Sequence, residues 1–595
     1  MTTKLERLFD FPYYQLEHHP LDKMMHSREA DEWKHISTKE FVNKMNLVSR
    51  GLLAIGVKPG DRIALITHCN RMEWDIMDHG IMQMGAVDVP IYPTMTSEDC
   101  KYILNHSESV YCFVSNAELF EKIQSIAHDV PSLRRVFTFE RVASASHWTE
   151  LFAQAENVKE DEVKQIADRV QASDLATIIY TSGTTGLPKG VMLSHQNIAS
   201  NAVSCEERLP LLVKGKSRCL SFLPISHIYE RMLHYLYIQN GVEMYLSGMD
   251  QIKDDLIIAR PNIFTGVPRL FEKFYDGIYS KGMSNKGIKL TLFKWAHALA
   301  LRWEPEGANG WWYEMQLWIA RKLVFSKVKS ALGLTEIGAV ASGSAALQSR
   351  LARFFNGAGI PVQEGYGLTE TSPVITVNTF RSPNMFKVGY VGKVISGVEI
   401  RLAEDGEILC KGPNVMMGYY KNPEQSSEVL RDGWFYTGDI GVIEHGFLKI
   451  TDRKKELFKT SGGKYVAPQV IENALKELLW IEQAMVIGDG QKFPSALIVP
   501  AMDALRAWAS EQKLEGLTNE ELLTHPAVMQ QFKKNIDSIN TRFGSWEQVK
   551  SFRLLPRLFD IEHGEITPTL KLKRKQILQN WSAQVEDIYK NQHSE

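Results

Sequence analysis

The run "YTSGTTGLPKG", Tyr180–Gly190, is the stretch on which the interpretation of this chain depends. It places glycines, Thr and Ser hydroxyls and one lysine in consecutive positions. Glycine lets backbone N–H groups come close to an anion, because no Cβ lies in the way. The hydroxyls add further donors, and Lys189 adds a positive charge. This composition predicts a loop that contacts phosphate.

The run differs from the two common phosphate-binding motifs. A Walker A loop needs G-x-x-x-x-G-K-[ST], whereas Lys189 follows Pro188 and precedes Gly190. The Rossmann pattern G-x-G-x-x-G is also absent from the run. The alternative is a polar surface turn. However, "DLATIIY" before the run and "GVMLSHQNIAS" after it indicate ordered structure on both sides, which favours a phosphate loop.

Length and composition set the protein class. The 595 residues, of which 44% are hydrophobic, suffice for several domains at roughly 150 residues each. A formal net charge of −2 gives no overall attraction to nucleic acid, so we expect no such partner. The cysteines are scattered, which argues against disulfides or zinc and favours a reducing compartment. We find no signal peptide and no run of ~18 uncharged apolar residues. These features predict a cytoplasmic protein.

The pattern along the chain predicts an α/β fold. Strand-like runs such as "RIALIT" and "VYCFVS" alternate with helical stretches such as "TKEFVNKMNLVSRGLLAIG". From about Val388 the segments become short and β-like, with a turn at Glu404-Asp405-Gly406. A compact α/β pattern follows Asp452. We therefore expect an N-terminal domain of α/β layers with a β-rich subdomain, residues 1–452, and a small α+β C-terminal domain, residues 453–595.

Further motifs follow the glycine-rich run in order. They are "QEGYGLTETSP" from Gln363, "WFYTGDIG" with Asp439, and "TDRKKELFK" with Arg453 and Lys455. Together they resemble the signatures of the adenylate-forming superfamily, which contains acyl-CoA synthetases, luciferases and the adenylation domains of peptide synthetases. The resemblance covers nearly the whole chain and implies a large lobed N-terminal domain followed by a small mobile C-terminal domain.

The resemblance assigns a nucleotide site. Tyr366 is expected to lie along adenine and Thr369 to reach phosphate; Glu370 would hold Mg²⁺ together with Thr181, and Asp439 would accept the ribose hydroxyls. A flat aromatic ring suits a purine, and a hard cation prefers oxygen ligands. Taken singly, Tyr366 is equally consistent with a core residue, Glu370 with a surface charge and Asp439 with a turn cap. The remaining residues expected to bind nucleotide or CoA are Ser182, Gly183, Thr184, Thr185, Gly186, Lys189, Gly343, Ser344, Gln363, Glu364, Gly365, Gly367, Arg453, Lys455 and Gly463.

The stretch "GEITPTLKLKRKQI", residues 564–577, supplies the predicted catalytic lysine. Many relatives have S-G-K near their end, whereas this chain has Thr569-Leu570-Lys571. That departure resembles long-chain acyl-CoA synthetases, and it implies that Lys571 bridges the acid's carboxylate and the α-phosphate. The competing candidates in the same basic stretch are Lys573, Arg574 and Lys575.

The resemblance also implies a rotation of the C-terminal domain near Lys455. Lys571 would face the site during adenylation, and the "SGGK" turn at Gly463 would face it when the CoA thiol attacks. The position of His227 in "LPISHIYERMLHYL" resembles a residue that borders the acyl carboxylate. A histidine among apolar residues is also often a satisfied core side chain.

The resemblance implies a ligase that uses ATP, Mg²⁺ and coenzyme A to convert a long-chain fatty acid into acyl-AMP and then acyl-CoA. The run Val267–Arg269 is similar to long-chain enzymes, but the gate tryptophan of some of them has no clear counterpart here. The alternatives are a ligase for another hydrophobic or aryl acid, an enzyme that passes acyl-AMP to a carrier protein, and a non-catalytic lipid-binding or scaffold protein.

Residues 286–334 are helical in pattern and rich in aromatic residues. Such a segment is typical either of a helix on a membrane surface or of an internal or interdomain helix. Its basic residues are not confined to one face, which favours the internal or interdomain helix. Peripheral membrane contact stays an alternative, and the sequence leaves a monomer and a homodimer equally open.

Overall fold

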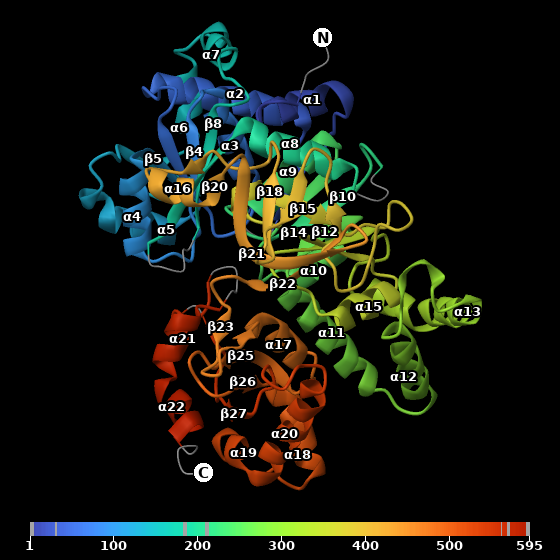
Figure 1. Cartoon of the computed structure of the whole chain (residues 1–595). Helices are drawn as coiled ribbons and strands as arrows, with labels where there is room; N and C mark the ends of the chain where they lie inside the picture. The colour runs from blue at the N-terminus through green and yellow to red at the C-terminus, as the bar shows by residue number, and fades with distance from the viewer. Residues whose placement is uncertain are drawn as a thin grey trace. The chain divides into compact units, whose positions relative to one another are not determined.

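Figure 1 shows the computed structural model of the protein, which describes residues 5–29, 32–181, 187–208, 213–560, 562–567 and 572–590. The chain divides into two compact units. The first comprises residues 1–401, 409–436 and 446–448, and the second comprises residues 402–408, 437–445 and 449–595. The domain boundary expected after residue 452 stays a prediction.

An eight-stranded sheet forms one layer of the first unit, in the order β19-β9-β8-β4-β3-β5-β6-β7. Its inner strands β3, β4, β5 and β6 pair in parallel, and every residue of β5 is buried. Burial on both faces explains the continuous apolar runs seen in the sequence. The strands are β3 (Arg62–Ile66), β4 (Val87–Pro90), β5 (Ser109–Val114), β6 (Arg135–Thr138), β7 (Ser146–His147), β8 (Leu175–Thr181), β9 (Lys189–Ser194) and β19 (Gly418–Tyr419).

A nine-stranded sheet forms the other main layer of this unit, in the order β16-β15-β14-β13-β12-β10-β11-β1-β2. Strands β11, β10, β12, β13 and β14 run parallel, and β15 and β16 then continue antiparallel. The strands are β1 (Met25–Glu29), β2 (Glu32–Ile36), β10 (Arg218–Ser221), β11 (Glu243–Leu246), β12 (Ile263–Gly266), β13 (Ala339–Ser342), β14 (Val362–Gly367), β15 (Val374–Val377) and β16 (Lys393–Val394).

Amphipathic helices cover these sheets. Helix α2 shows why: a capping box between Ser37 and Glu40 starts it, and Phe41, Met45 and Leu52 bury one face. The helices of this unit are α1 (Asp10–His18), α2 (Thr38–Ala54), α3 (Met72–Gln83), α4 (Ser97–Ser107), α5 (Ala117–Ile126), α6 (Glu150–Ala155), α7 (Glu160–Ala167), α8 (His195–Glu206), α9 (Ile228–Gln239), α10 (Ile252–Ala259), α11 (Pro268–Met283), α12 (Ile288–Ala300), α13 (Trp311–Ala320), α14 (Ser326–Ala331), α15 (Ser349–Gly357) and α16 (Pro423–Val429).

A buried ionic network fixes α9 against the eight-stranded sheet. The fully buried Arg231 lies 2.5 Å from an oxygen of Asp78 on α3 and 3.0 Å from an oxygen of Asp88 on β4. It also donates to the hydroxyl of Thr177 on β8, at 2.8 Å. Removal of one partner from such a buried network leaves an uncompensated charge, so the network holds α9 in one position relative to β8.

A five-stranded sheet has the order β17-β18-β21-β20, with β22 paired to β21. Gly406 has a φ of +83° in the turn that joins β17 to β18, as the turn pattern predicted. The strands are β17 (Glu399–Leu402), β18 (Glu407–Lys411), β20 (Leu430–Arg431), β21 (Trp434–Glu444) and β22 (Phe447–Arg453). The predicted α/β layers and β-rich segment are thereby confirmed.

The part of the second unit that follows β22 is a small α+β structure. It contains a three-stranded sheet and a β-ribbon, formed by β23 (Phe458–Lys459), β24 (Tyr465–Val466), β25 (Ile481–Ile487), β26 (Ser495–Pro500) and β27 (Ser551–Leu554). Its helices are α17 (Pro468–Leu475), α18 (Met502–Glu511), α19 (Asn519–Thr524), α20 (Pro526–Asn540), α21 (Arg574–Asn580) and α22 (Ser582–Lys590).

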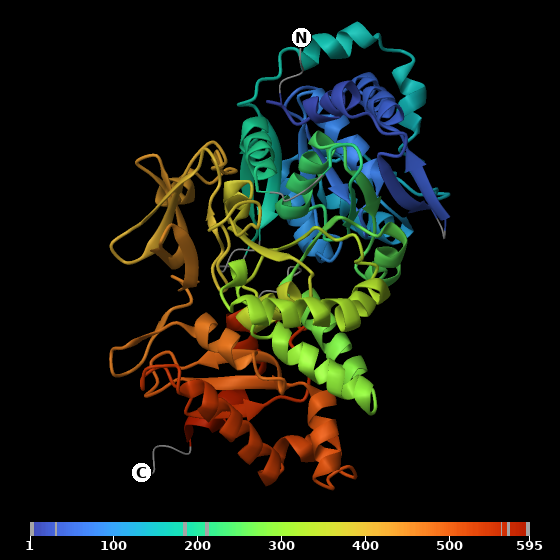
Figure 2. The same ribbon diagram turned by 90° about the vertical axis from the view of Figure 1, so that its right-hand side faces the viewer.

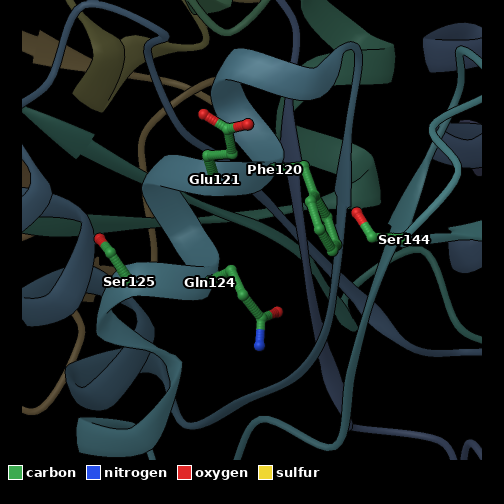
Figure 3. Close-up of a pocket in the computed structure, with 5 residues that line it drawn as sticks. All are labelled: Phe120, Glu121, Gln124, Ser125 and Ser144. Carbon is green, nitrogen blue, oxygen red and sulfur yellow. The ribbon is translucent and has the colours of Figure 1, made fainter.

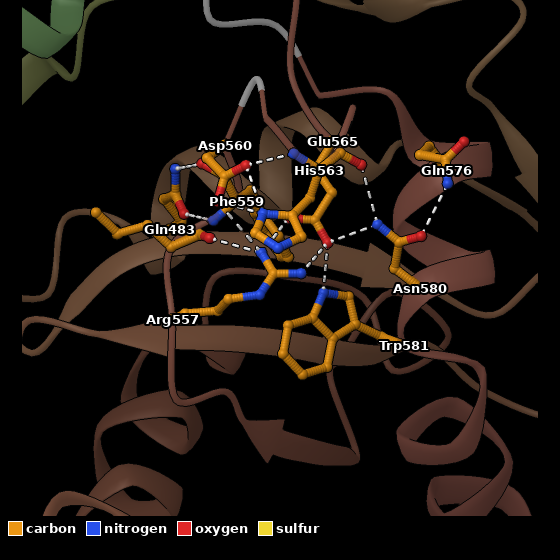
Figure 4. Close-up of polar contacts among 10 residues, drawn as sticks. Gln483, Arg557, Phe559, Asp560, His563, Glu565, Gln576, Asn580 and Trp581 are labelled. Carbon is orange, nitrogen blue, oxygen red and sulfur yellow. Dashed lines mark hydrogen bonds and ion pairs between the residues drawn. The ribbon is translucent and has the colours of Figure 1, made fainter.

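A polar cluster in this unit surrounds the buried carboxylate of Glu565 (Figure 4). Glu565 accepts two hydrogen bonds from Arg557, at 2.6 and 2.8 Å, and one from the indole of Trp581, at 2.9 Å. Its carbonyl accepts from the backbone N–H of Lys573 at 2.7 Å. The cluster therefore joins the two chain segments that flank residues 568–571, a segment outside the described residues.

Helices α12 and α13 lie beside each other in both views (Figures 1 and 2). Tyr313, Leu317 and Ala320 bury one side of α13, while Trp311 and Trp318 on its other side are exposed. One side of α13 therefore packs internally as expected, and its outer side faces solvent; the choice between an interdomain and an interfacial helix stays a prediction. Among the described residues, no helix is long and apolar enough to cross a membrane.

Candidate active site

Strands β8 and β9 form an antiparallel hairpin that carries the glycine-rich run. Thr181 and Lys189 are partners in the register, and so are Tyr180 and Gly190. Gly190 is required here, because a Cβ would lie 2.8 Å from a methyl carbon of Ile178. The predicted phosphate-contact residues Ser182, Gly183, Thr184, Thr185 and Gly186 lie outside the described residues. The hairpin nevertheless brings the two ends of the loop together.

Tyr419 connects this hairpin to the segment that contains Glu370. Strand β19 pairs with β9, so that Tyr419 lies opposite Val191. The ammonium nitrogen of Lys189 lies 5.3 Å from the centre of the Tyr419 ring, within cation–π distance. The Tyr419 hydroxyl donates to Oε1 of Glu370 at 2.9 Å. The structure thus brings Lys189 and Glu370 to the same aromatic side chain.

The segment after β14 holds Thr369 and Glu370 in a short 3₁₀ turn, Thr369–Thr371. A Cβ at Gly367 would lie 1.7 Å from the carbonyl oxygen of Pro373, so only glycine permits this close backbone approach. Thr369 is buried, and Glu370 is half-buried. Tyr366 is half-buried and packs against the main hydrophobic core of the unit. The turn orients the Glu370 carboxylate towards Tyr419.

The turn that contains Gly343 and Ser344, both predicted to bind nucleotide or CoA, follows β13 directly. Gly343 donates its N–H to the carbonyl of Gly266, and a Cβ at Gly343 would lie 3.0 Å from the ring of Tyr229. Ser344 has a φ of +69°, in the left-handed region that side chains rarely occupy. The turn at Gly343 and Ser344 therefore packs its backbone against an aromatic face at the carboxyl end of the sheet.

Buried polar atoms gather where β13 and β14 end. Ser342 and Glu364 are register partners, and the next pair along the strands joins Ala341 to Gln363. Within the described residues, the Ser342 hydroxyl, the Gln363 amide nitrogen and one oxygen of Glu364 are buried without a hydrogen-bond partner. Ligands of open α/β sheets bind at the carboxyl ends of the strands. Unpaired polar atoms at this edge suit a polar ligand.

Glu364 is a protonated carboxyl group near neutral pH. Burial raises its pKa to about 8, although a hydrogen bond from the backbone N–H of Leu347 at 3.3 Å acts in the opposite direction. The neighbouring Gly365 pairs with Val377 of β15. The protonated Glu364 can donate a hydrogen bond at the sheet edge, whereas the half-buried Glu370 has carboxylate oxygens of the kind that Mg²⁺ prefers as ligands.

His227 caps the N-terminus of α9. Its Nδ1 accepts a hydrogen bond from the backbone N–H of Tyr229 at 3.1 Å. Its ring lies 6.5 Å from that of Tyr92, edge to face. This capping role gives a specific structural reason for the histidine, and its contact with an acid stays a prediction.

A cavity of about 400 Å³ borders the loop hairpin and is lined by Lys189, Gly190, Tyr419 and Lys421, among others. Another cavity, of about 540 Å³, lies on α5 and is lined by Phe120, Glu121, Gln124, Ser125 and Ser144 (Figure 3). It contains none of the predicted site residues. The cavity beside Lys189 is the better candidate for a nucleotide phosphate, because Lys189 and Lys421 line it.

The second unit holds the other predicted nucleotide contacts. Asp439 on β21 is buried, and the Nε atom of Arg453 on β22 lies 3.4 Å from one of its oxygens. Lys455 is exposed. Gly463 lies in the exposed turn between β23 and β24 with a φ of +80°. Lys571 lies outside the described residues.

The sequence did not reveal two aromatic residues of this arrangement, Tyr419 and Tyr229. Tyr419 is separated from Lys189 by more than half of the first unit's sequence, and only the pairing of β19 with β9 joins them. Tyr229 lies in the same motif as His227, but no spacing relates it to Gly343. A pattern of glycine followed by aromatic residues in "MMGYYKNPE" is the only signal that Tyr419 gave.

Comparison with known proteins identifies the family. Residues 13–420 match the AMP-binding enzymes, and residues 456–593 match the C-terminal domain of AMP-binding enzymes. The chain belongs to the family of AMP-binding enzymes. The resemblance found in the sequence is therefore confirmed.

Relatives of this AMP-binding enzyme span nearly its whole length. It is 34% identical over 576 residues to long-chain-fatty-acid–CoA ligase FadD15 of Mycobacterium bovis, which covers 96% of this chain and 94% of the relative. It is 31% identical over 605 residues to Homo sapiens long-chain-fatty-acid–CoA ligase 1, and this match covers 95% of this chain and 84% of the relative.

A solved structure shows the same fold. The adenylation domain of a carboxylate reductase from Mycobacterium chelonae matches with a TM-score of 0.74 at 19% identity, over 98% of this chain and 91% of that domain. The predicted adenylate-forming fold is confirmed by this likeness.

Proposed function

We propose that this AMP-binding enzyme is an ATP-dependent long-chain fatty acid–CoA ligase. The acid and ATP give acyl-AMP and pyrophosphate, and the thiol of CoA then displaces AMP to give acyl-CoA. The observation that carries the proposal is the convergence of Lys189 and Glu370 on Tyr419, in a chain whose relatives are named long-chain fatty acid–CoA ligases.

The chemistry explains why these residue types are needed. A carboxylate and ATP repel each other, and a carboxylate has no leaving group that a thiol can displace. Transfer of AMP to the acid supplies that leaving group. Preorganised donors that offset the developing charge are worth ~3 kcal/mol each. No protein nucleophile is required for either step.

The proposed nucleotide contacts follow the motifs of the family. Lys189 and the backbone of residues 182–186 neutralise the β- and γ-phosphates, Tyr366 lies along adenine, and Asp439 accepts the ribose hydroxyls. Glu370 and the Thr181 hydroxyl would hold Mg²⁺, which neutralises phosphate charge when bound. The hydrogen bond from Tyr419 supports this role for Glu370, because it fixes one carboxylate oxygen and so orients the group.

The proposed roles in the acid step involve Lys571 and His227. Lys571 offsets negative charge as the carboxylate attacks the α-phosphorus, and His227 borders that carboxylate. We propose two poses of the C-terminal domain, pivoting near Lys455: one presents Lys571 for adenylation, and the other presents the Gly463 turn for attack by the thiol. The left-handed φ of Gly463 in an exposed turn supports a backbone position that a thiol approaches closely.

The proposal includes the location and assembly of the enzyme. The enzyme acts in the cytoplasm, as a monomer or a homodimer, and contacts a membrane peripherally where a long-chain acid is found. A ligase for another hydrophobic or aryl acid is the runner-up for the substrate.

Acid-dependent release of pyrophosphate tests the proposal. The purified protein is supplied with ATP, Mg²⁺, CoA and dodecanoate, and both pyrophosphate and acyl-CoA are measured. The proposal expects equal amounts of the two products. Release of pyrophosphate without thioester would favour transfer to a carrier protein, and no release with any acid would favour the non-catalytic alternative.

A further inference from the structure

The outer face of α13 is apolar although it faces solvent. Trp311, Trp312, Met315 and Trp318 expose 77%, 58%, 39% and 61% of their surface, and we call these four residues the tryptophan face. All 13 tryptophans of the chain lie in the described residues, and among them only Trp311, Trp312, Trp318 and Trp546 are exposed. Exposed tryptophans concentrated on one short helix indicate an interaction surface.

The tryptophan face is not needed for the hydrophobic core. Trp311, Met315 and Trp318 recur at helical spacing on one side of α13, whereas Tyr313 and Leu317 bury the opposite side. The rings of Trp311 and Trp312 lie edge to face at 5.6 Å, so they form a contiguous aromatic surface. A helix that is apolar on both sides is typically buried on both sides, either in protein or in a membrane.

The chain segment that contains this apolar surface is rich in positive charge. Residues 281–329 contain nine Lys or Arg and three Glu. The ammonium group of Lys322 lies 5.2 Å from the ring of Trp318, one helical turn along the same face. The other exposed lysines of this region are Lys281, Lys286, Lys289, Lys294 and Lys327. The tryptophan face thus has a lysine beside it and belongs to a basic segment, although the chain as a whole carries a formal charge of −2.

We propose that the tryptophan face of α13 inserts into the interfacial region of an anionic lipid surface, with Lys322 and its neighbouring lysines on the headgroups. Tryptophan is enriched at membrane interfaces, where its ring is apolar and its N–H is polar. Lysines near an anionic surface add electrostatic attraction. A second copy of this chain fits less well, because a symmetric contact would bring two basic surfaces together. This inference rests on the proposed function, because contact with lipid is useful to an enzyme whose long-chain acid substrate partitions into a lipid surface.

Vesicle binding of the full-length protein tests this proposal. Vesicles of phosphatidylcholine alone and of phosphatidylcholine with phosphatidylglycerol are used, and bound protein is measured by flotation. We expect binding to the anionic vesicles, and a loss of roughly tenfold or more when Trp311→Gln and Trp318→Gln are combined. Lys322→Gln should cost about fivefold, which corresponds to ~1 kcal/mol per lysine. Trp546→Gln and Lys534→Gln, on the other unit, are the matched controls and should bind like the wild type.

Three outcomes would overturn the proposal: no binding of the wild type to anionic vesicles, unchanged binding of the double tryptophan variant, or equal loss in the Trp546 control. If the double variant changes a dimer to a monomer and leaves vesicle binding intact, the surface is a contact between copies. Ligase activity is measured in parallel without vesicles, on dodecanoate. It should be unchanged in the double variant, which shows that the fold is intact. A wild type without ligase activity would contradict the proposed function, yet its vesicle binding would still decide the lipid proposal.

Discussion

Replacing Tyr419 by phenylalanine removes one hydroxyl group and leaves the ring beneath Lys189 in place. That hydroxyl donates to Glu370 at 2.9 Å, and the tyrosine is 7% exposed. A hydrogen bond to a charged group contributes about 1.5–3 kcal/mol. If Glu370 holds Mg²⁺ as proposed, loss of its orientation should lower kcat/KM for MgATP by about 10- to 150-fold.

The assay is steady-state pyrophosphate release with dodecanoate at several Mg²⁺ concentrations. Tyr419→Phe should need more Mg²⁺ for half-maximal rate, because the carboxylate is no longer fixed. Tyr420→Phe is the matched control, since Tyr420 is the next residue and its ring also borders the cavity beside Lys189. We expect the control to stay within about twofold of the wild type, as is usual for a change away from a specific contact.

Two results would refute this reasoning. A kcat/KM of Tyr419→Phe within twofold of the wild type would mean that the hydrogen bond does not orient a working group. Equal losses in Tyr419→Phe and Tyr420→Phe would mean that the effect comes from the cavity in general rather than from Glu370.

Three further predictions concern stability and the separate reaction steps. Glu364 has a folded pKa of about 8 against an ordinary value of 4.5, so the folded state retains a proton that the unfolded state loses between these values. Stability should therefore fall as pH rises from 4.5 to 8, by up to about 1.4 kcal/mol per pH unit from this group, and urea unfolding of Glu364→Gln should show a flatter pH dependence. Arg231→Met leaves two buried aspartates without their cation and should cost about 3–5 kcal/mol in urea unfolding at pH 7. Lys571→Ala should abolish most acid-dependent pyrophosphate exchange and still convert supplied acyl-AMP and CoA to thioester. Gly463→Leu should do the reverse, because a side chain at this turn would obstruct the thiol.

Each of these predictions has an outcome that contradicts it. An unchanged pH slope in Glu364→Gln would show that this carboxyl group ionises normally in the folded protein. An unfolding cost of Arg231→Met below ~1 kcal/mol, the range of an exposed ion pair, would show that the network is not a buried one. Equal impairment of both half-reactions in either Lys571→Ala or Gly463→Leu would contradict the two-pose assignment, while the ligase proposal itself would remain open.

The sequence predicted what depends on local pattern. The runs around Ile63 and Val110 are strands because both sheet faces are covered, and the turn before Gly406 has the backbone that its sequence requires. The two strands that flank the phosphate loop were also predictable, because apolar runs stand on both sides of the glycines. Motifs from the recognised family then supplied the order of the site residues along the chain.

The remaining features depend on contacts between distant segments, which no local pattern records. Tyr419 reaches Glu370 only because β19 adds to the edge of β9. Burial at the end of β14 raises the pKa of Glu364. Its sequence neighbours do not indicate this burial, because they resemble those of an ordinary polar turn. For α13, the distribution of basic residues favoured an internal or interdomain helix. In the structure Tyr313 and Leu317 pack inwards, which leaves the tryptophans of this helix exposed.

Formation of CoA thioester from a panel of acids, from C4 to C20 together with aryl acids, tests the central claim most directly. Each buried methylene contributes ~0.8 kcal/mol, so the preference should rise steeply with chain length until the binding site is filled. The proposed function predicts saturation at low concentrations of C12–C18 acids and poor use of the shortest acids. Faster turnover of butyrate or coumarate than of palmitate would contradict it.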